Sequence, residues 1–254
     1  MPQKLPHTGL LPDSLPTAVL TCGDPARAAQ IAGYLDDAVC LAQQREYHSY
    51  QGTFQGLPLA VCSHGIGAPG AAIAFEELIM AGARILVRVG TCGSLQTAVH
   101  PGDLVVVTAA VQHTGYGREA APPGYPAIAD LDLTQTLRQT VQAGGQANHQ
   151  GIVLTRDAFF AGSATPFAPS YAALSAANVL AVEMECAALF LVGSLRRIRT
   201  AAILVVNGSV LEKPESADTF ASHEEVVATA VSAAIEAALH TLVNFQLGEL
   251  NASV

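Results

Sequence analysis

Short apolar runs alternate with segments of helical periodicity along most of the chain. The runs have the length of strands, and several are rich in β-branched residues, so they predict buried strands. They cover residues 18–20, 57–63, 84–89, 104–109, 152–154, 179–182 and 202–206. Strands that alternate with helices predict a single-domain α/β fold, with a central mixed, largely parallel β-sheet flanked by helices on both faces.

Capping signals locate the helices. Asp24 and Pro25 are residue types preferred at the N-cap and at the first helical position, so a helix should follow the first strand. A second helix is predicted over residues 71–80. The amphipathic segment 222–245 predicts a long C-terminal helix, which opens with the capping box Ser222-His223-Glu224-Glu225.

Length and composition favour one domain over residues 1–254, because half of the 254 residues are apolar. Only 13% are charged, so apolar surface should also be buried between subunits, and we expect a homo-oligomer. The proline-rich segment 1–16 predicts an extended N-terminal arm over the protein's own fold or a neighbour. The glycine and proline residues of segment 113–127 predict a loop.

The formal net charge of −9 argues against nucleic acid or an anionic membrane as a partner, although a local arginine cluster could bind a small anion. The five cysteines show no C-x-x-C spacing, which argues against a disulfide framework and a zinc site. We therefore expect buried, reduced thiols and a cytoplasmic protein. No apolar run has the pattern of a signal peptide or the uncharged length of a membrane span, so we expect neither.

Residues 65–70 fit the dinucleotide-binding pattern G-x-G-x-x-G between a strand and a helix. The next strand lacks the acidic residue that would bind a ribose there, and it ends with Arg88. A close strand-to-helix turn therefore explains the glycines better than nicotinamide binding does. Such a turn still lies at the carboxyl edge of a parallel sheet, where ligands bind.

Arginines follow two of the predicted strands. Arg27 lies one turn into the first helix, behind Gly23, where a guanidinium and free backbone N–H groups could bind a tetrahedral oxyanion; the alternative is a solvated helix residue. Arg88 ends an apolar strand just before the glycine-rich segment 90–93, which we expect to form a turn. A buried arginine is costly without an anion, so a bound anion would offset that cost. Arg45 belongs to a third charged segment, Arg45-Glu46-Tyr47, and a surface salt bridge is the alternative explanation for its charge.

Two carboxylates, Glu183 and Glu185, stand in an otherwise apolar run. Charges are rarely placed in such a run without partners. A carboxylate can accept two hydrogen bonds from a vicinal diol, and a ribose offers such a diol. The run therefore suggests a sugar site.

Six motifs in order resemble those of the hexameric nucleoside phosphorylases, the family that includes uridine phosphorylase and bacterial purine nucleoside phosphorylase. The resemblance extends from about His7 to the C-terminal helix. The motifs are Gly23-Asp24-Pro25-x-Arg27, Arg45-Glu46-Tyr47, His64-Gly65-Ile66-Gly67-x-Pro69, Arg88-Val89-Gly90-Thr91-Cys92-Gly93, Tyr125-Pro126-Ala127-Ile128-Ala129-Asp130 and Val182-Glu183-Met184-Glu185.

The resemblance implies phosphate-dependent cleavage of a nucleoside, with inorganic phosphate as co-substrate and no metal or organic cofactor. It implies a hexamer built as three dimers, in which Arg45 and His7 reach a neighbour's site. The implied catalytic residues are Arg88, Glu185 and Asn207. The implied binding residues are Gly23, Arg27, Arg45, Arg88 and Thr91 for phosphate, His7, Met184 and Glu185 for ribose, and Cys92, Gly93, Phe159 and Glu183 for the base.

The base end departs from both branches of the family. Ser163-Ala164-Thr165 stands where uridine enzymes carry Gln-x-Arg, and Asn207-Gly208-Ser209 stands where purine enzymes carry the Ser-Asp pair. Asn207 and Arg45 favour the uridine branch, whereas the short connection from Phe159 to Glu183 favours the purine branch. Uridine is our first expectation and a purine nucleoside the alternative. A water-using nucleosidase and a nucleoside-binding protein without turnover are further alternatives.

Overall fold

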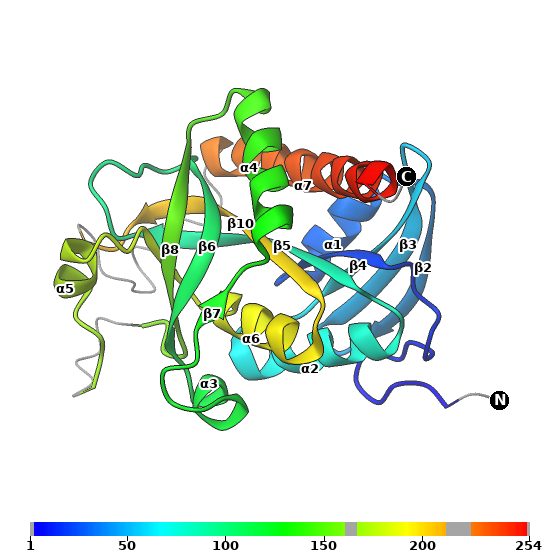
Figure 1. The fold of residues 1–254 in the computed structure, drawn as a ribbon, viewed down its shortest axis with the longest axis horizontal. Helices are drawn as coiled ribbons and strands as arrows, with labels where there is room; N and C mark the ends of the chain where they lie inside the picture. The colour runs from blue at the N-terminus through cyan, green and yellow to red at the C-terminus, as the bar shows by residue number, and fades with distance from the viewer. Residues whose placement is uncertain (1–2, 161–166, 212–224, 253–254) are drawn as a thin grey trace.

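A ten-stranded mixed sheet forms the centre of the fold, and helices pack on both of its faces (Figure 1). The computed structural model describes residues 3–160, 167–211 and 225–252. The predicted α/β class is confirmed. The strands are β1 (Ala18–Cys22), β2 (Asp36–Gln44), β3 (Tyr47–Phe54), β4 (Leu57–Ser63), β5 (Ile85–Ser94), β6 (Leu104–His113), β7 (Ala127–Ile128), β8 (Asn148–Arg156), β9 (Ala181–Glu183) and β10 (Arg199–Ser209).

The sheet runs in the order β10-β6-β8-β9-β5-β1-β4-β3-β2, and β10 pairs with β5 as well, so five strands form a closed ring. Parallel pairings join β1 to β4 and β5, β5 to β10, and β8 to β6 and β9. Because β1 and β5 are parallel, their carboxyl ends lie at one edge of the sheet, whereas β8 runs antiparallel to β5. Ligands bind at such an edge in open α/β sheets.

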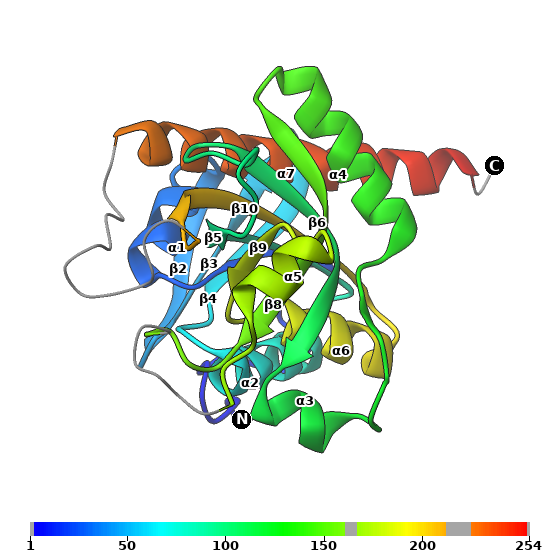
Figure 2. The same ribbon diagram turned by 90° about the vertical axis from the view of Figure 1, so that its left-hand side faces the viewer.

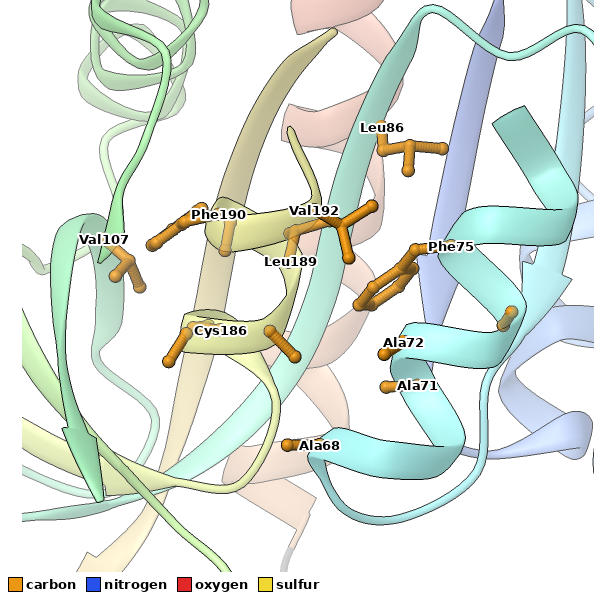
Figure 3. Close-up of a cluster of buried hydrophobic side chains, with 14 of the residues drawn as sticks. Ala68, Ala71, Ala72, Phe75, Leu86, Val107, Cys186, Leu189, Phe190 and Val192 are labelled. Carbon is orange, nitrogen blue, oxygen red and sulfur yellow. The ribbon is translucent and has the colours of Figure 1, made fainter. Parts of the chain in front are cut away.

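Helices α1, α4 and α7 cover one face of the sheet, and α2, α3 and α6 cover the other (Figures 1 and 2). On the second face, α2 packs directly against α6. Phe75 and Ala72 of α2 face Leu189 and Val192 of α6 in the core between them (Figure 3). The helices are α1 (Pro25–Ala32), α2 (Ala68–Met80), α3 (Gly115–Ala120), α4 (Leu131–Gly144), α5 (Tyr171–Ala176), α6 (Cys186–Arg196) and α7 (Glu225–Ala252).

The predicted start of α1 is confirmed, since the Asp24 carboxylate accepts a hydrogen bond from Ala26 N at 2.8 Å and Pro25 opens the helix. Helix α2 begins at Ala68, three residues before the predicted start, because its proline at position 69 is accommodated in the first turn. Residues 222–224 of the predicted capping box lie outside the described residues. The segment 113–127 is not a plain loop, because it contains α3 and the first residue of β7.

One hairpin lies outside the predicted strands, and one predicted turn is wrong. The hairpin of β2 and β3 was missed because these strands carry mostly polar or exposed residues, so no apolar run marks them. Residues 90–93 do not form a turn. Strand β5 continues through them to Ser94, because β10 pairs with it along this whole stretch and β9 pairs with its end.

The N-terminal arm attaches to its own chain beside α2. Asp13 N and Leu15 N donate hydrogen bonds to the carbonyls of Met80 and Ala81, and Leu10 is buried. The N–H groups of His7 and Thr8 donate to the carboxylate of Glu77. The arm is thus anchored at the end of α2.

Helix α7 is long and apolar enough to cross a membrane by length and composition. Half of its most apolar window is buried inside the protein. Its residues Val227, Ile235 and Leu242 belong to the core cluster that α7 shares with α1 and α4. Packing within the fold therefore accounts for the apolar side of this helix.

Four cysteines are buried, but Cys40 on the edge strand β2 is exposed, so the expectation of five buried thiols is wrong for this residue. Burial raises the pKa of the thiols of Cys22 and Cys62 to about 12. These two thiols therefore stay protonated near neutral pH.

Candidate active site

A cavity of about 870 Å³ is lined by residues at or just beyond the carboxyl ends of β1, β5, β8 and β9. It brings together most of the residues that the sequence assigned to phosphate, sugar and base. Those that line it are Gly23, Arg27, Arg88, Thr91, Cys92, Gly93, Phe159, Glu183, Met184, Glu185 and Asn207. His7 and Arg45 are not among its lining residues.

Gly23 and Arg27 form the end of the cavity beside β1. Gly23 lies between β1 and α1, where a Cβ atom would come within 3.2 Å of Gly65 O, so the two backbone segments approach closely. Arg27 is half-buried, and no ion pair joins it to any described residue. Burial lowers the pKa of its guanidinium, and the charge of Arg88 adds to this effect. A bound anion would relieve both effects.

Arg88 is buried and carries two carboxylate partners. Its Nη2 bonds to Glu185 and lies 3.3 Å from an oxygen of Glu183. Burial alone would lower the pKa of Arg88, but the charge of Glu185 and then that of Glu183 outweigh it, and the pKa is raised. Glu185 and Glu183 therefore offset the cost of burying Arg88. The sequence alone predicts that a bound anion has this role. Its Nε has no hydrogen-bond partner among the described residues.

Glu185 lies at the start of α6, opposite the start of α2. Its Oε1 accepts a hydrogen bond from Gly67 N at 2.7 Å, so the amino end of α2 faces the carboxylate. Burial raises the pKa of Glu185, while the charge of Arg88 and the Gly67 hydrogen bond act against this rise. Two different elements thus hold this carboxylate in place.

The carboxylate of Glu183 accepts hydrogen bonds from other residues of the protein. Its Oε1 accepts from Thr155 Oγ1 at 2.5 Å, and its Oε2 accepts from the N–H groups of Glu185 and Cys186, both at 2.8 Å. The carboxylate therefore fixes the turn that presents Glu185. These hydrogen bonds make Glu183 a positioning residue, and its predicted contact with the base stays a prediction.

Phe159, Cys92, Gly93 and Met184 also line the cavity. Gly93 lets Val210 pack against β5, because a Cβ atom at this position would collide with the valine side chain. The Phe159 ring contacts that of Phe160 edge to face, with their centroids 5.2 Å apart. Ser163 and Thr165, which raised the question of base recognition, lie outside the described residues.

Arg156 is a cavity residue that sequence reasoning missed. It is the last residue of β8, is 3% exposed, and has no carboxylate partner among the described residues. The sequence does carry a signal for Arg156. This arginine comes just after the apolar run 152–154, and Arg88 lies near the end of the apolar run 84–89. Only the structure shows that both strands end at the same cavity.

Unsatisfied polar atoms concentrate at this cavity. Among the described residues, the buried side-chain atoms without a hydrogen-bond partner are Arg88 Nε, Arg156 Nε, Asn207 Oδ1 and Thr134 Oγ1. All but the last belong to cavity residues. Buried polar groups in proteins are normally paired, so this concentration is typical of a site that a polar ligand completes.

His7 and Arg45 lie elsewhere on the same chain. The His7 ring is 2.6 Å from Glu77, and Arg45 is exposed at the tip of the β2–β3 hairpin with a φ of 55°. Their role at a neighbour's cavity stays a prediction. Glu46, next to Arg45, does line the cavity and packs over Gly65. Within the described part of the chain, no three His, Cys, Asp or Glu side chains gather as metal ligands would.

Comparison with known proteins shows the family to which the chain belongs. The family model of the phosphorylase superfamily matches residues 17–243. The chain is 35% identical to uridine phosphorylase of Treponema pallidum over 91% of this chain and 92% of that protein. It is 36% identical to purine nucleoside phosphorylase of Plasmodium vivax over 82% and 85% of the two chains.

A solved structure gives the same result for the fold. Purine nucleoside phosphorylase from Toxoplasma gondii, crystallised in complex with immucillin-H, superposes with a TM-score of 0.88 at 31% identity. The match covers 96% of this chain and 97% of that one. The chain therefore belongs to the phosphorylase superfamily and, within it, to the nucleoside phosphorylases.

Proposed function

We propose that this protein uses inorganic phosphate to cleave the N-glycosidic bond of a nucleoside, releasing the free base and ribose or deoxyribose 1-phosphate. One observation carries the proposal. Arg27, a half-buried cation without an ion-pair partner among the described residues, shares a cavity with Arg88, Thr91 and the buried carboxylate of Glu185. An anion site thus adjoins a group suited to a sugar diol.

The order of strands supports this arrangement. Gly23 follows β1, Thr91 belongs to the neighbouring β5, and Glu183 ends β9 on the other side of β5. Phosphate bound between Gly23, Arg27 and Thr91 would therefore lie beside a sugar held by Glu185 and Met184. Fixing the two reactants side by side removes much of the entropic barrier to their reaction.

The reaction follows from this geometry. A phosphate oxygen attacks C1′ of the sugar, the bond between C1′ and the base nitrogen breaks, and its electron pair leaves with the base. Glu185 accepts hydrogen bonds from the sugar hydroxyls, and its negative charge stabilises the oxocarbenium-like transition state. Arg88 holds Glu185 through the buried ion pair. The unpaired Nε of Arg88 remains available for phosphate.

Uridine is the substrate that we propose first. Asn207, which resembles the asparagine of the uridine enzymes, lines the cavity with an unpaired side-chain oxygen that can accept from the base. A purine nucleoside is the second candidate, because the Plasmodium vivax and Toxoplasma gondii relatives carry that name at comparable identity.

One assay tests the reaction. Release of free base is measured from uridine, thymidine, inosine and adenosine, with and without phosphate. Phosphate-dependent release supports the proposal, and the fastest nucleoside identifies the base. Release without phosphate would identify a nucleosidase, and tight binding without release would identify a binding protein; either result overturns the proposal.

We further propose that the active form is a cytoplasmic hexamer of three dimers, in which His7 and Arg45 act at a neighbour's cavity. Arg45 is exposed at the tip of the β2–β3 hairpin, so its guanidinium is accessible to a neighbouring subunit. Mixed assemblies of Arg45→Met and Arg88→Met subunits test this idea. Some sites in such assemblies would hold both native arginines, so the mixture should be more active than either variant; equal inactivity would contradict shared sites.

A further inference from the structure

We infer that Arg156 binds a carbonyl oxygen of the base and stabilises the negative charge that the base acquires as it leaves. The inference rests on the proposed function and identifies a class of substrate for it, namely nucleosides whose base carries an exocyclic oxygen next to a ring N–H. Uracil, hypoxanthine and guanine have this edge, whereas adenine and cytosine carry an amino group in its place.

The burial of Arg156 without a carboxylate partner among the described residues is the first reason for this inference. Among the described residues, two buried arginines line the cavity, and of these two only Arg88 has carboxylate partners there. Arg156 is 3% exposed, and its partners among the described residues are the hydroxyl and the ring of Tyr171. A buried guanidinium is always charged, and burying it without an anion is costly. A ligand that carries or develops negative charge would offset this cost.

The geometry of the side chain is the second argument. Nη1 of Arg156 donates to Tyr171 Oη at 2.7 Å, and Cζ lies 5.5 Å from the centroid of the Tyr171 ring. These contacts fix the guanidinium. Its Nε, in contrast, has no hydrogen-bond partner in the described part of the protein. A fixed arginine with an unused donor at a cavity is a preorganised site for an oxygen atom.

The position of Arg156 in the sheet identifies which part of the substrate it meets. Going from β1 to β5, β9 and β8 crosses three strand spacings, or about 14 Å along the sheet. Gly23 and Arg27 lie at the first end, Glu183 lies on β9, and Arg156 lies at the last end. With phosphate at the first end and the sugar at Glu185, the base extends towards Arg156 and Phe159.

A second unpaired atom complements the arginine. Arg156 offers only donors, while Asn207 presents the unpaired acceptor Oδ1 to the same cavity. A base edge that carries a carbonyl beside an N–H satisfies both residues. The amino group of adenine or cytosine would instead face the donors of Arg156.

The charge that develops on the leaving base gives Arg156 a role in the rate of bond cleavage as well as in recognition of the base. When the C1′–N bond breaks, its electron pair delocalises from the base nitrogen onto the carbonyl oxygens. Arg156 stabilises that charge by hydrogen bonding, and the released base then takes a proton from water. The interaction is stronger in the transition state than in the ground state, so it should raise kcat more than it lowers KM.

Kinetics of Arg156→Met, Arg156→Lys and Tyr171→Phe test the inference, with Arg118→Met as a control for loss of one positive charge at an exposed position outside the cavity. With uridine or inosine, whichever the wild type cleaves faster, we expect Arg156→Met to lower kcat by about 100-fold. Arg156→Lys keeps the positive charge but lacks the planar set of N–H donors of the guanidinium, so its kcat should lie between those of the wild type and Arg156→Met. Tyr171→Phe should lose less than Arg156→Met, and Arg118→Met should match the wild type.

A comparison of uridine with 5-fluorouridine separates this role from a structural one. The fluorinated base is a better leaving group and needs less charge stabilisation, so Arg156→Met should slow uridine cleavage more than 5-fluorouridine cleavage. A purely structural defect would slow both equally and would overturn the inference. If Arg156→Met does not fold, Arg156→Lys carries the same comparison.

The outcomes distinguish the two proposals. If the wild type shows phosphate-dependent cleavage and Arg156→Met and Arg156→Lys retain full activity and base preference, the inference fails while the proposed function stands. A wild type that prefers adenosine or cytidine would also overturn the inference alone. If the wild type cleaves no nucleoside with phosphate, the proposed function fails and the inference fails with it.

Discussion

The guanidinium of Arg88 folds back over Gly90, two residues further along the same strand. A Cβ atom added to Gly90 would lie 2.6 Å from Arg88 Cζ and 2.8 Å from Nη2. Nη2 is the atom that bonds to Glu185 and Glu183. Gly90 is therefore the residue that permits the buried ion pair, and its role is spatial, because its backbone needs no left-handed conformation.

Gly90→Ala should break this arrangement. The new methyl group would push the guanidinium away from Glu185 and leave buried charges without partners, at a cost of about 3 kcal/mol in the free energy of unfolding. Urea unfolding measures this loss. Gly208→Ala is the matched control, because no atom of the described residues lies within 4 Å of a Cβ added to this cavity glycine. Its effect should stay within about 0.5 kcal/mol, and equal losses in both variants would contradict the spatial argument.

Arg27→Met should abolish stabilisation by phosphate without destabilising the free protein. Arg27 has no ion-pair partner among the described residues, and burial lowers its pKa, so replacing it removes an unfavourable charge. Phosphate at 100 times its Kd should stabilise the wild type by about 2.7 kcal/mol. Thermal unfolding with and without phosphate measures the difference. Arg118→Met should retain the phosphate effect, and a full effect in Arg27→Met would remove this residue from the anion site.

Local sequence signals predicted the elements that build the cavity. The apolar runs located β1, β4 and β5 because these strands lie inside the sheet and bury both faces. Asp24 and Pro25 located the start of α1 because capping depends on residues next to each other in the chain. The resemblance then supplied the site residues, and the family is confirmed.

Features that depend on distant contacts could not be predicted in this way. The extension of β5 through Gly90 and Gly93 depends on pairing with β10, more than a hundred residues later. The partners of Arg88 follow from the position of α6. Arg156 has no carboxylate partner among the described residues, although Asp157 and Glu183 are near it, because these two acids bond to Gly115 and Thr155 instead. Charge at a strand end indicates a site, but its pairing depends on the fold.

Cys40 should be the one thiol that reacts quickly in the native protein. It is exposed on β2, whereas the other four are buried, and burial raises the pKa of Cys22 and Cys62 to about 12. The thiolate is the reactive form, so buried protonated thiols react slowly. Titration with a disulfide reagent at pH 8 should give one equivalent per native chain and five after denaturation. Cys40→Ser should give none in the native state, and a remaining fast equivalent would contradict the burial pattern.

His64 should make the protein less stable at mildly acidic pH. Its ring is buried between Arg88 and Phe75, with Nδ1 2.8 Å from Gly65 O and Nε2 3.5 Å from Arg88 Nη1. Burial lowers the pKa of His64 well below its ordinary value, and the charge of Arg88 lowers it further. The ring is therefore neutral in the folded state at pH values where it is protonated in the unfolded state.

The sign of the effect follows from proton binding. The unfolded state binds a proton as the pH falls through about 6.5 and the folded state does not, so the contribution of His64 is complete above pH 6.5 and is lost below it. The slope is about 1.4 kcal/mol per pH unit until the folded pKa is reached. Urea unfolding between pH 8 and 5.5 should show a smaller acid loss in His64→Gln than in the wild type. His100→Gln, at an exposed position, should follow the wild type; identical acid losses in all three proteins would show that His64 is protonated in the folded state.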